Sequence, residues 1–215
     1  DALPIYTLNH LDGCAYRHHP VMLAVPADVY AFDPKYITEW NGLRVPAAYD
    51  CDIFNGGKHW GPFFYFYEVQ TRWYACWQHH ANIKSGNTLV QPQLPLVDDE
   101  YNEHTALYQS VLRSRRDQTF VAAEFGARWG TWGSRAAALF RRVRQQQDFR
   151  LHFIESARVY CDAIHVVMEA NGMNGHYTLD CARAATANVR AWMEGVDHVD
   201  VIDMDIQGAE RRLVP

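Results

Sequence analysis

A glycine-containing turn at residues 124–133 is the segment of this sequence best suited to chemistry. It reads Glu-Phe-Gly-Ala-Arg-Trp-Gly-Thr-Trp-Gly, and it follows the apolar run from Phe120 to Phe125. Glycines after a strand let the backbone approach a ligand closely and aim the N–H groups of the next helix at it. The spacing is neither the Gly-x-Gly-x-x-Gly of dinucleotide-binding turns nor a P-loop. A ligand-binding turn and a purely structural strand–helix turn therefore both stay open.

A carboxylate at the end of the next apolar run is the second candidate. Glu155 closes a predicted strand from Leu151 to Glu155. A carboxylate in that position can accept hydrogen bonds from both ribose hydroxyls of a nucleoside. The alternative is that Glu155 caps a helix beginning near Ser156. The preceding glycine turn favours ligand binding.

Two further carboxylates, Asp203 and Asp205, stand at alternate positions near the end of a predicted strand. Alternate residues of a strand point to the same side, and Glu210 follows about one helical turn later. A carboxylate here can position a substrate hydroxyl or act as a base. We expect no metal, because these carboxylates have no obvious histidine partner.

The elements that must position these residues alternate between strands and helices after residue 96. One helix is predicted from Asp98 to about Arg115, with Asp98 or Asp99 as its cap. Two more are predicted around the apolar positions 132–143 and 160–168. Strands are predicted at Phe120–Phe125, Leu151–Glu155, His176–Cys181 and Val199–Asp205. Such alternation predicts an α/β fold with a parallel, Rossmann-like sheet and right-handed crossovers.

The first 95 residues have a different character. Turn signals are dense, and the aromatic segments Phe63–Tyr67 and Arg72–Trp77 read as strands. A proline-containing linker, Gln91–Pro95, follows. We predict a β-rich or irregular region at 1–95, followed by a Rossmann-like domain at 96–215.

Four motifs in order resemble the FkbM-type methyltransferases. They are Asp-Glu-Tyr-Asn-Glu-His at 99–104, Glu-Phe-Gly-Ala-Arg-Trp-Gly at 124–130, Phe-Ile-Glu at 153–155 and Met-Asp-Ile-Gln-Gly-Ala-Glu at 204–210. The resemblance covers roughly the last 120 residues, and the last motif is the most specific. It implies a Rossmann-like methyltransferase fold and methyl transfer from S-adenosylmethionine, usually to a hydroxyl oxygen.

Carried over by position, the resemblance implies a cofactor site and a reacting centre. Glu124, Gly126 and Gly130 would line the methionine end of the cofactor, and Glu155 would hold its ribose. Asp205 and Gln207 would face the reacting centre, and Tyr101 with Glu103 would close over the cofactor. The candidate bases are Asp205 and His104.

The sequence departs from the family pattern at two points. Arg128 stands where the family usually has its second glycine, and it would either crowd the cofactor carboxylate or pair with it. A positive φ at this residue would cost about 1–2 kcal/mol. The sequence also stops soon after Glu210, before the later strands of a seven-stranded methyltransferase sheet. We therefore expect either a fragment or half a fold kept for a structural purpose.

Two functions follow as expectations. The first is an S-adenosylmethionine-dependent methyltransferase whose acceptor is a hydroxyl of a small molecule or glycan. The alternative is a catalytically inactive methyltransferase-like subunit, with a structural role in a larger assembly or homo-oligomer.

The composition limits which classes of partner and which cellular compartment are expected for this protein. The net charge of −5 argues against a nucleic-acid surface, and no apolar run is long enough to span a membrane. Five scattered cysteines without a Cys-x-x-Cys pair are typical of free thiols in a reducing compartment. We therefore expect an intracellular protein, cytoplasmic or organellar.

Overall fold

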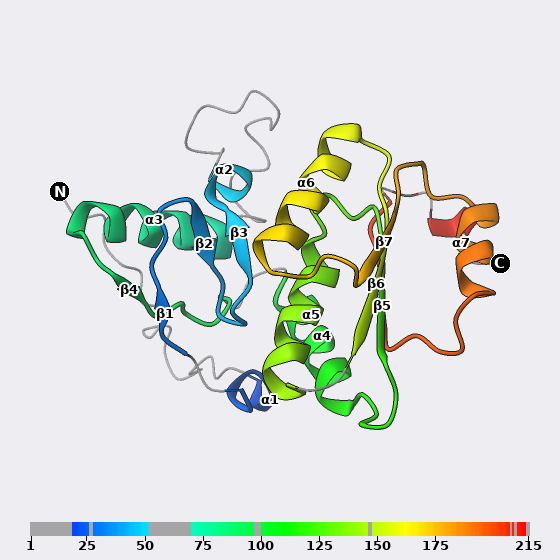
Figure 1. Cartoon of the computed structure of the whole chain (residues 1–215), viewed down its shortest axis with the longest axis horizontal. Helices are drawn as coiled ribbons and strands as arrows, with labels where there is room; N and C mark the ends of the chain where they lie inside the picture. Colours follow the sequence, from blue (N-terminus) through cyan, green and yellow to red (C-terminus); the bar gives the residue numbers. More distant parts are fainter. Residues whose placement is uncertain are drawn as a thin grey trace, which may run out of the picture.

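A four-stranded parallel sheet forms the centre of the molecule (Figure 1). The computed structural model describes residues 19–25, 28–51, 70–96, 100–145, 148–206, 208 and 210–213. The strands are β5 (Phe120–Phe125), β6 (Phe149–Ile154), β7 (Tyr177–Asp180) and β8 (Val201–Met204), in the spatial order β7-β6-β5-β8. All four lie within or beside the strands predicted from the apolar runs, so the α/β alternation is confirmed.

The central strand, β5, sets the register of the sheet. Ala122 faces Leu151 of β6 on one side and Val201 of β8 on the other. Every residue of β5 is buried. A strand with neighbours on both edges and helices on both faces is expected to be mostly apolar, which explains the Phe-Val-Ala-Ala run that precedes Glu124.

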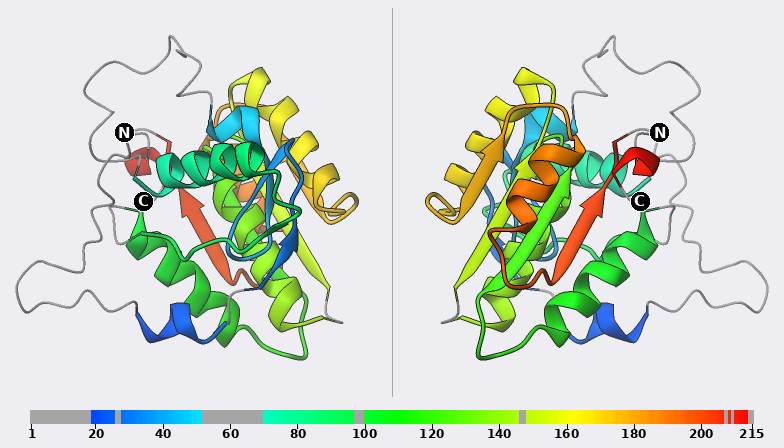
Figure 2. Two further views of the ribbon diagram at one scale, coloured as in Figure 1. Left: turned by 90° about the vertical axis from the view of Figure 1, so that its left-hand side faces the viewer. Right: turned by 90° about the vertical axis from the view of Figure 1, so that its right-hand side faces the viewer.

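Helices cover both faces of the sheet. One face carries α4 (Tyr101–Arg113), α5 (Thr131–Val143) and α6 (Arg158–Ala170), while α7 (Thr186–Met193) lies on the other (Figure 1). The right-hand view of Figure 2 shows α7 in front of the sheet. The first three helices match the predicted ones, but residues 97–99, which hold the expected caps Asp98 and Asp99, lie outside the described residues. The sequence did not predict α7.

The N-terminal part consists of short elements and one long helix. They are α1 (Pro20–Leu23), β1 (Tyr30–Ala31), β2 (Tyr36–Thr38), β3 (Arg44–Pro46), α2 (Ala47–Asp50), α3 (Gln70–Ser85) and β4 (Leu89–Val90). β2 and β3 form an antiparallel hairpin, and β1 pairs with β4. The left-hand view of Figure 2 shows α3 across this end of the molecule.

The prediction of a strand at Arg72–Trp77 is wrong, because this segment belongs to α3. No proline or glycine interrupts residues 70–85, and Gly86 follows in the left-handed conformation that ends many helices. Aromatic residues favour strands only where a sheet can receive them. The other aromatic segment, Phe63–Tyr67, lies outside the described residues.

The two parts of the chain share one hydrophobic core. Met22, Trp40 and Leu43 from the N-terminal part belong to the same buried cluster as Tyr108 of α4 and Phe140 of α5. The rings of Trp40 and Tyr108 lie 5.3 Å apart. The N-terminal elements therefore pack against α4 and α5.

The expectation of free thiols is wrong for four of the five cysteines. Cys51 is bonded to Cys76, and Cys161 is bonded to Cys181. The partners are 25 and 20 residues apart, so only the fold brings them together. The inference of a reducing compartment loses its support, since disulfides persist mainly in oxidising environments.

The described helices include none that is both long enough and apolar enough to cross a membrane.

Candidate functional site

The carboxyl edge of the sheet between β5 and β8 is a topological switch point. The chain moves outward from β5 to β6 and β7, then returns to the other side of β5 as β8. In open α/β sheets, ligands bind in the crevice outside the carboxyl ends of the strands at such a point. The glycine turn after β5 and the Asp205–Glu210 segment after β8 both begin at this edge.

The glycine turn adopts a left-handed backbone conformation at three alternate residues. Gly126, Arg128 and Gly130 have φ values of 83°, 51° and 82°. At Gly126, a Cβ would collide with the carbonyl oxygen of Asp205. Gly130 then leads directly into α5 as its N-cap residue. Close approach of two backbones therefore requires glycine at position 126.

Arg128 reaches the conformation that its side chain disfavours. It is the one residue other than glycine with positive φ among the described residues. Its N–H donates a hydrogen bond of 2.8 Å to Oε2 of Glu155. This contact, together with the glycines on either side, holds Arg128 in a conformation that costs about 1–2 kcal/mol.

Glu124 lies beneath the start of α5. Its side chain is 1% exposed and accepts hydrogen bonds from the N–H groups of Trp132 (3.0 Å) and Gly133 (2.8 Å). Burial, with a smaller contribution from the Asp203 carboxylate, raises the pKa of Glu124 to about 8. Glu124 thus accepts hydrogen bonds from two N–H groups in the first turn of α5, which have no partner within the helix.

Asp203 lies opposite Glu124 in the parallel register of β8 and β5. Burial raises the pKa of Asp203 to about 6, and the charges of Asp205, Glu103 and Glu100 add to this effect. Several carboxylates therefore share one side of the switch point. In this arrangement one of them is readily protonated near neutral pH.

Glu155 bridges the glycine turn and the start of α6. Besides the Arg128 contact, its Oε1 accepts the N–H of Ala157 at 2.7 Å. Glu155 therefore holds both the glycine turn and the residue just before α6, but it is not the N-cap of that helix, which is Ala157. Each carboxylate oxygen has two lone pairs, but Glu155 is only 6% exposed, so little of its carboxylate is open to a ligand hydroxyl.

The segment after β8 turns over the end of β5. The Asp205 N–H donates to the carbonyl of Phe125 at 3.0 Å, and the Asp205 residue is exposed. Glu210, at the start of the 3-10 helix Glu210–Arg212, accepts the N–H groups of Ile206 and Gly208 and closes the loop. Gln207 lies outside the described residues.

The two candidates on α4 are buried. The Tyr101 hydroxyl accepts the N–H of His19 at 2.8 Å, so it ties α4 to the N-terminal segment. The His104 ring meets the Trp132 ring edge-on at 4.9 Å, just beyond the glycine turn. His104 is therefore buried against α5, whereas Asp205 is exposed at the carboxyl edge of the sheet.

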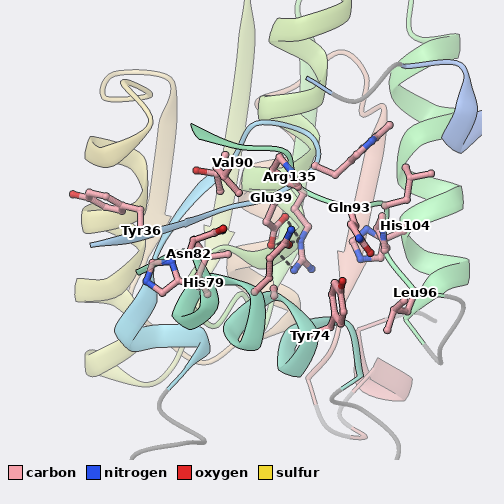
Figure 3. Close-up of a pocket in the computed structure, with 18 of the residues that line it drawn as sticks. Tyr36, Glu39, Tyr74, His79, Asn82, Val90, Gln93, Leu96, His104 and Arg135 are labelled. Carbon is pink, nitrogen blue, oxygen red and sulfur yellow. Dashed lines mark hydrogen bonds and ion pairs between the residues drawn. The ribbon is translucent and has the colours of Figure 1, made fainter. Parts of the chain in front are cut away.

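A cavity of about 70 Å³ lies between the N-terminal part and the α4–α5 layer, and His104 is in its wall (Figure 3). Tyr74, His79 and Asn82 of α3 line another part of it. Known small-molecule sites are several times larger, at about 300–1,000 Å³. Between the described residues, this cavity holds at most a few water molecules.

A buried ion pair, which sequence reasoning missed, forms part of this wall. The Arg135 guanidinium donates hydrogen bonds to both carboxylate oxygens of Glu39, the shortest being Nε to Oε2 at 2.9 Å and Nη2 to Oε1 at 2.8 Å (Figure 3). It also lies 4.8 Å from the Trp132 ring centre. The sequence does place an arginine on the apolar face of the predicted helix, which indicates a buried partner. It does not identify that partner, because Glu39 is 96 residues away.

Comparison with known proteins supplies no family for this chain. It matches no model of a known protein family, and no similar sequence was found among curated proteins.

Proposed function

We propose that this chain binds S-adenosylmethionine at the carboxyl edge of its sheet and transfers the methyl group to a hydroxyl oxygen. The observation that carries the proposal is the left-handed turn from Gly126 to Gly130, which lies at the β5–β8 switch point and is bonded to Glu155. A strand, a turn of this conformation and a carboxylate at the end of the next strand are the parts that a nucleoside cofactor needs.

The residues at this edge have separate tasks in the proposal. Glu155 would accept the ribose hydroxyls, and the turn would receive the methionine end of the cofactor. S-adenosylmethionine supplies an activated methyl group, so the protein needs mainly to hold an oxygen nucleophile in line with it. Asp205 is exposed at the end of β8 and would accept the hydroxyl proton. Buried His104 is the less accessible base.

The alternative is a methyltransferase-like subunit without activity, in a larger assembly or homo-oligomer. One observation favours it: Glu124 and Glu155 already accept backbone N–H groups of the protein itself. Under this alternative, both carboxylates serve only to hold the turn and the helix starts.

Calorimetric titration with S-adenosylhomocysteine separates the two. We expect micromolar binding by the native chain, weakened about tenfold or more (about 1.4 kcal/mol) in Glu155→Gln. The matched control is Glu194→Gln, an exposed glutamate after α7, which should bind as the native chain does. Thermal unfolding of each variant checks that it is folded. No binding by the folded native chain would favour the inactive subunit.

A further inference from the structure

A second cavity, of about 440 Å³, lies at the opposite end of α5 from the glycine turn. Its walls come from β1, the β2–β3 loop, the start of β3, the last turns of α5 and the end of α6. This volume is within the range of small-ligand sites. We call this cavity the polar groove and define it by Asp28, Tyr30, Arg44, Arg141, Arg142 and Asn171.

The polar groove is positively charged in a chain whose net charge is −5. Among the described residues, three arginines and one carboxylate, that of Asp28, line it. Asp33 forms an ion pair with Arg44 but is not part of the lining. A planar guanidinium matches the oxygens of a phosphate or sulfate with two parallel hydrogen bonds.

Contacts within the protein hold these arginines in place. Arg44 Nη2 is 2.7 Å from Asp33 Oδ2, and the Arg44 backbone exchanges two 2.8 Å hydrogen bonds with the side-chain amide of Asn171. Arg142 donates to the carbonyl of Trp40 at 2.8 Å, and Arg141 donates to the carbonyl of Asn171. A guanidinium has five N–H donors, so exposed Arg141 keeps donors for a ligand.

The ends of α5 and α6 explain only part of this arrangement. Cations are favourable beside the negative end of a helix dipole, which accounts for Arg141 and Arg142. It does not account for Arg44, which comes from β3. Nor does it account for the buried hydroxyl of Tyr30, which has no hydrogen-bond partner among the described residues.

The Tyr30 hydroxyl lies against Gly42, another residue of the groove wall. A Cβ at position 42 would come within 2.9 Å of this oxygen, so glycine leaves room for it. Tyr30 thus helps to form the wall of the groove, while its hydroxyl is closed off from solvent. We propose that the polar groove binds the phosphate or sulfate group of a small ligand, through Arg44, Arg141 and Arg142.

Titration of the native chain with inorganic phosphate, inorganic sulfate and glucose 6-phosphate, followed by calorimetry and thermal unfolding, tests the proposal. We expect saturable binding that Arg141→Gln weakens about fivefold or more. Asp28→Asn should strengthen binding about twofold, because it removes the one carboxylate of the lining. The matched control is Arg113→Gln, an exposed arginine in the last turn of α4, which should leave binding unchanged.

The outcomes are distinct. Tighter binding of glucose 6-phosphate than of inorganic phosphate would identify a phosphorylated small molecule, and equal binding would identify the free ion. Absence of saturable binding by the folded native chain, or equal weakening by Arg113→Gln, would overturn the proposal. Arg141→Gln should leave S-adenosylhomocysteine binding unchanged, so this test stands apart from that of the proposed function.

Discussion

At the scale of single residues, Glu124 holds the start of α5, but its burial disfavours the charged form of its carboxyl group. Two N–H groups at the start of α5 bind its carboxylate, yet burial and Asp203 raise its pKa to about 8. An acid whose pKa is higher in the folded than in the unfolded state stabilises the fold at low pH. That contribution is lost as the pH rises through the folded-state pKa.

The free energy of unfolding should therefore fall as the pH rises from about 4.5, the ordinary pKa of a glutamate, to about 8, and level off above that, with a total loss of roughly a few kcal/mol. Asp203→Asn should make this fall shallower, because it removes both a charge beside Glu124 and a second group whose pKa is raised. Urea unfolding at several pH values measures the effect. The exposed control Asp197→Asn should keep the native slope, and an unchanged slope in Asp203→Asn would contradict this account.

Arg128 offers a second test at the residue scale. Arg128→Gly should raise the free energy of unfolding by about 0.5–1 kcal/mol, because relief of the left-handed strain exceeds the entropy that glycine adds to the unfolded chain. Arg128→Ala keeps a Cβ and should give no gain. Equal stabilities of the two variants in chemical denaturation would show that the turn is unstrained.

At the scale of elements, the contact between the glycine turn and the segment after β8 closes the switch point. Gly126→Ala should destabilise the protein by about 3 kcal/mol or more, because the added Cβ meets the Asp205 carbonyl. Gly172→Ala is the control, since Gly172 also has positive φ but has open space around it. It should cost only about 1–2 kcal/mol. Similar losses in thermal unfolding would argue against the close approach.

The helix α7 depends on its packing. Its eight residues are too few for a stable isolated helix, and Trp192 packs on Phe125 and stacks on His152 with ring centres 4.9 Å apart. Trp192→Ala should remove the hydrogen-exchange protection of α7 and cost about 3 kcal/mol. Met193→Ala, at an exposed position of the same helix, should leave protection nearly unchanged.

At the scale of the whole molecule, the two disulfides join distant segments. Each closes a loop of about 20–25 residues and should contribute about 3 kcal/mol. Alkylation of the denatured, unreduced protein should modify Cys14 alone, and reduction should expose all five thiols and lower the Tm. Five reactive thiols before reduction would restore the expectation of a reducing compartment.

Local patterns in the sequence determined the second half of the fold. Buried parallel strands need apolar runs, and helices on a sheet need an apolar stripe, so the order of β5, α5, β6, α6, β7 and β8 could be predicted. The same patterns predicted the glycine turn and the carboxylates beside it. The helix α3 could not be predicted, because aromatic residues suit either a strand or a packed helix.

Only the tertiary structure decided which distant groups meet. The Glu39–Arg135 ion pair, both disulfides, the hydrogen bond from Arg128 to Glu155 and the Arg44–Asn171 contact in the polar groove join residues 20 to 127 positions apart. No local spacing encodes such pairs, because they depend on the order of the strands and on which face of the sheet each crossover takes. The sequence thus determined the elements and their chemistry, and the packing of those elements decided the partner of each side chain.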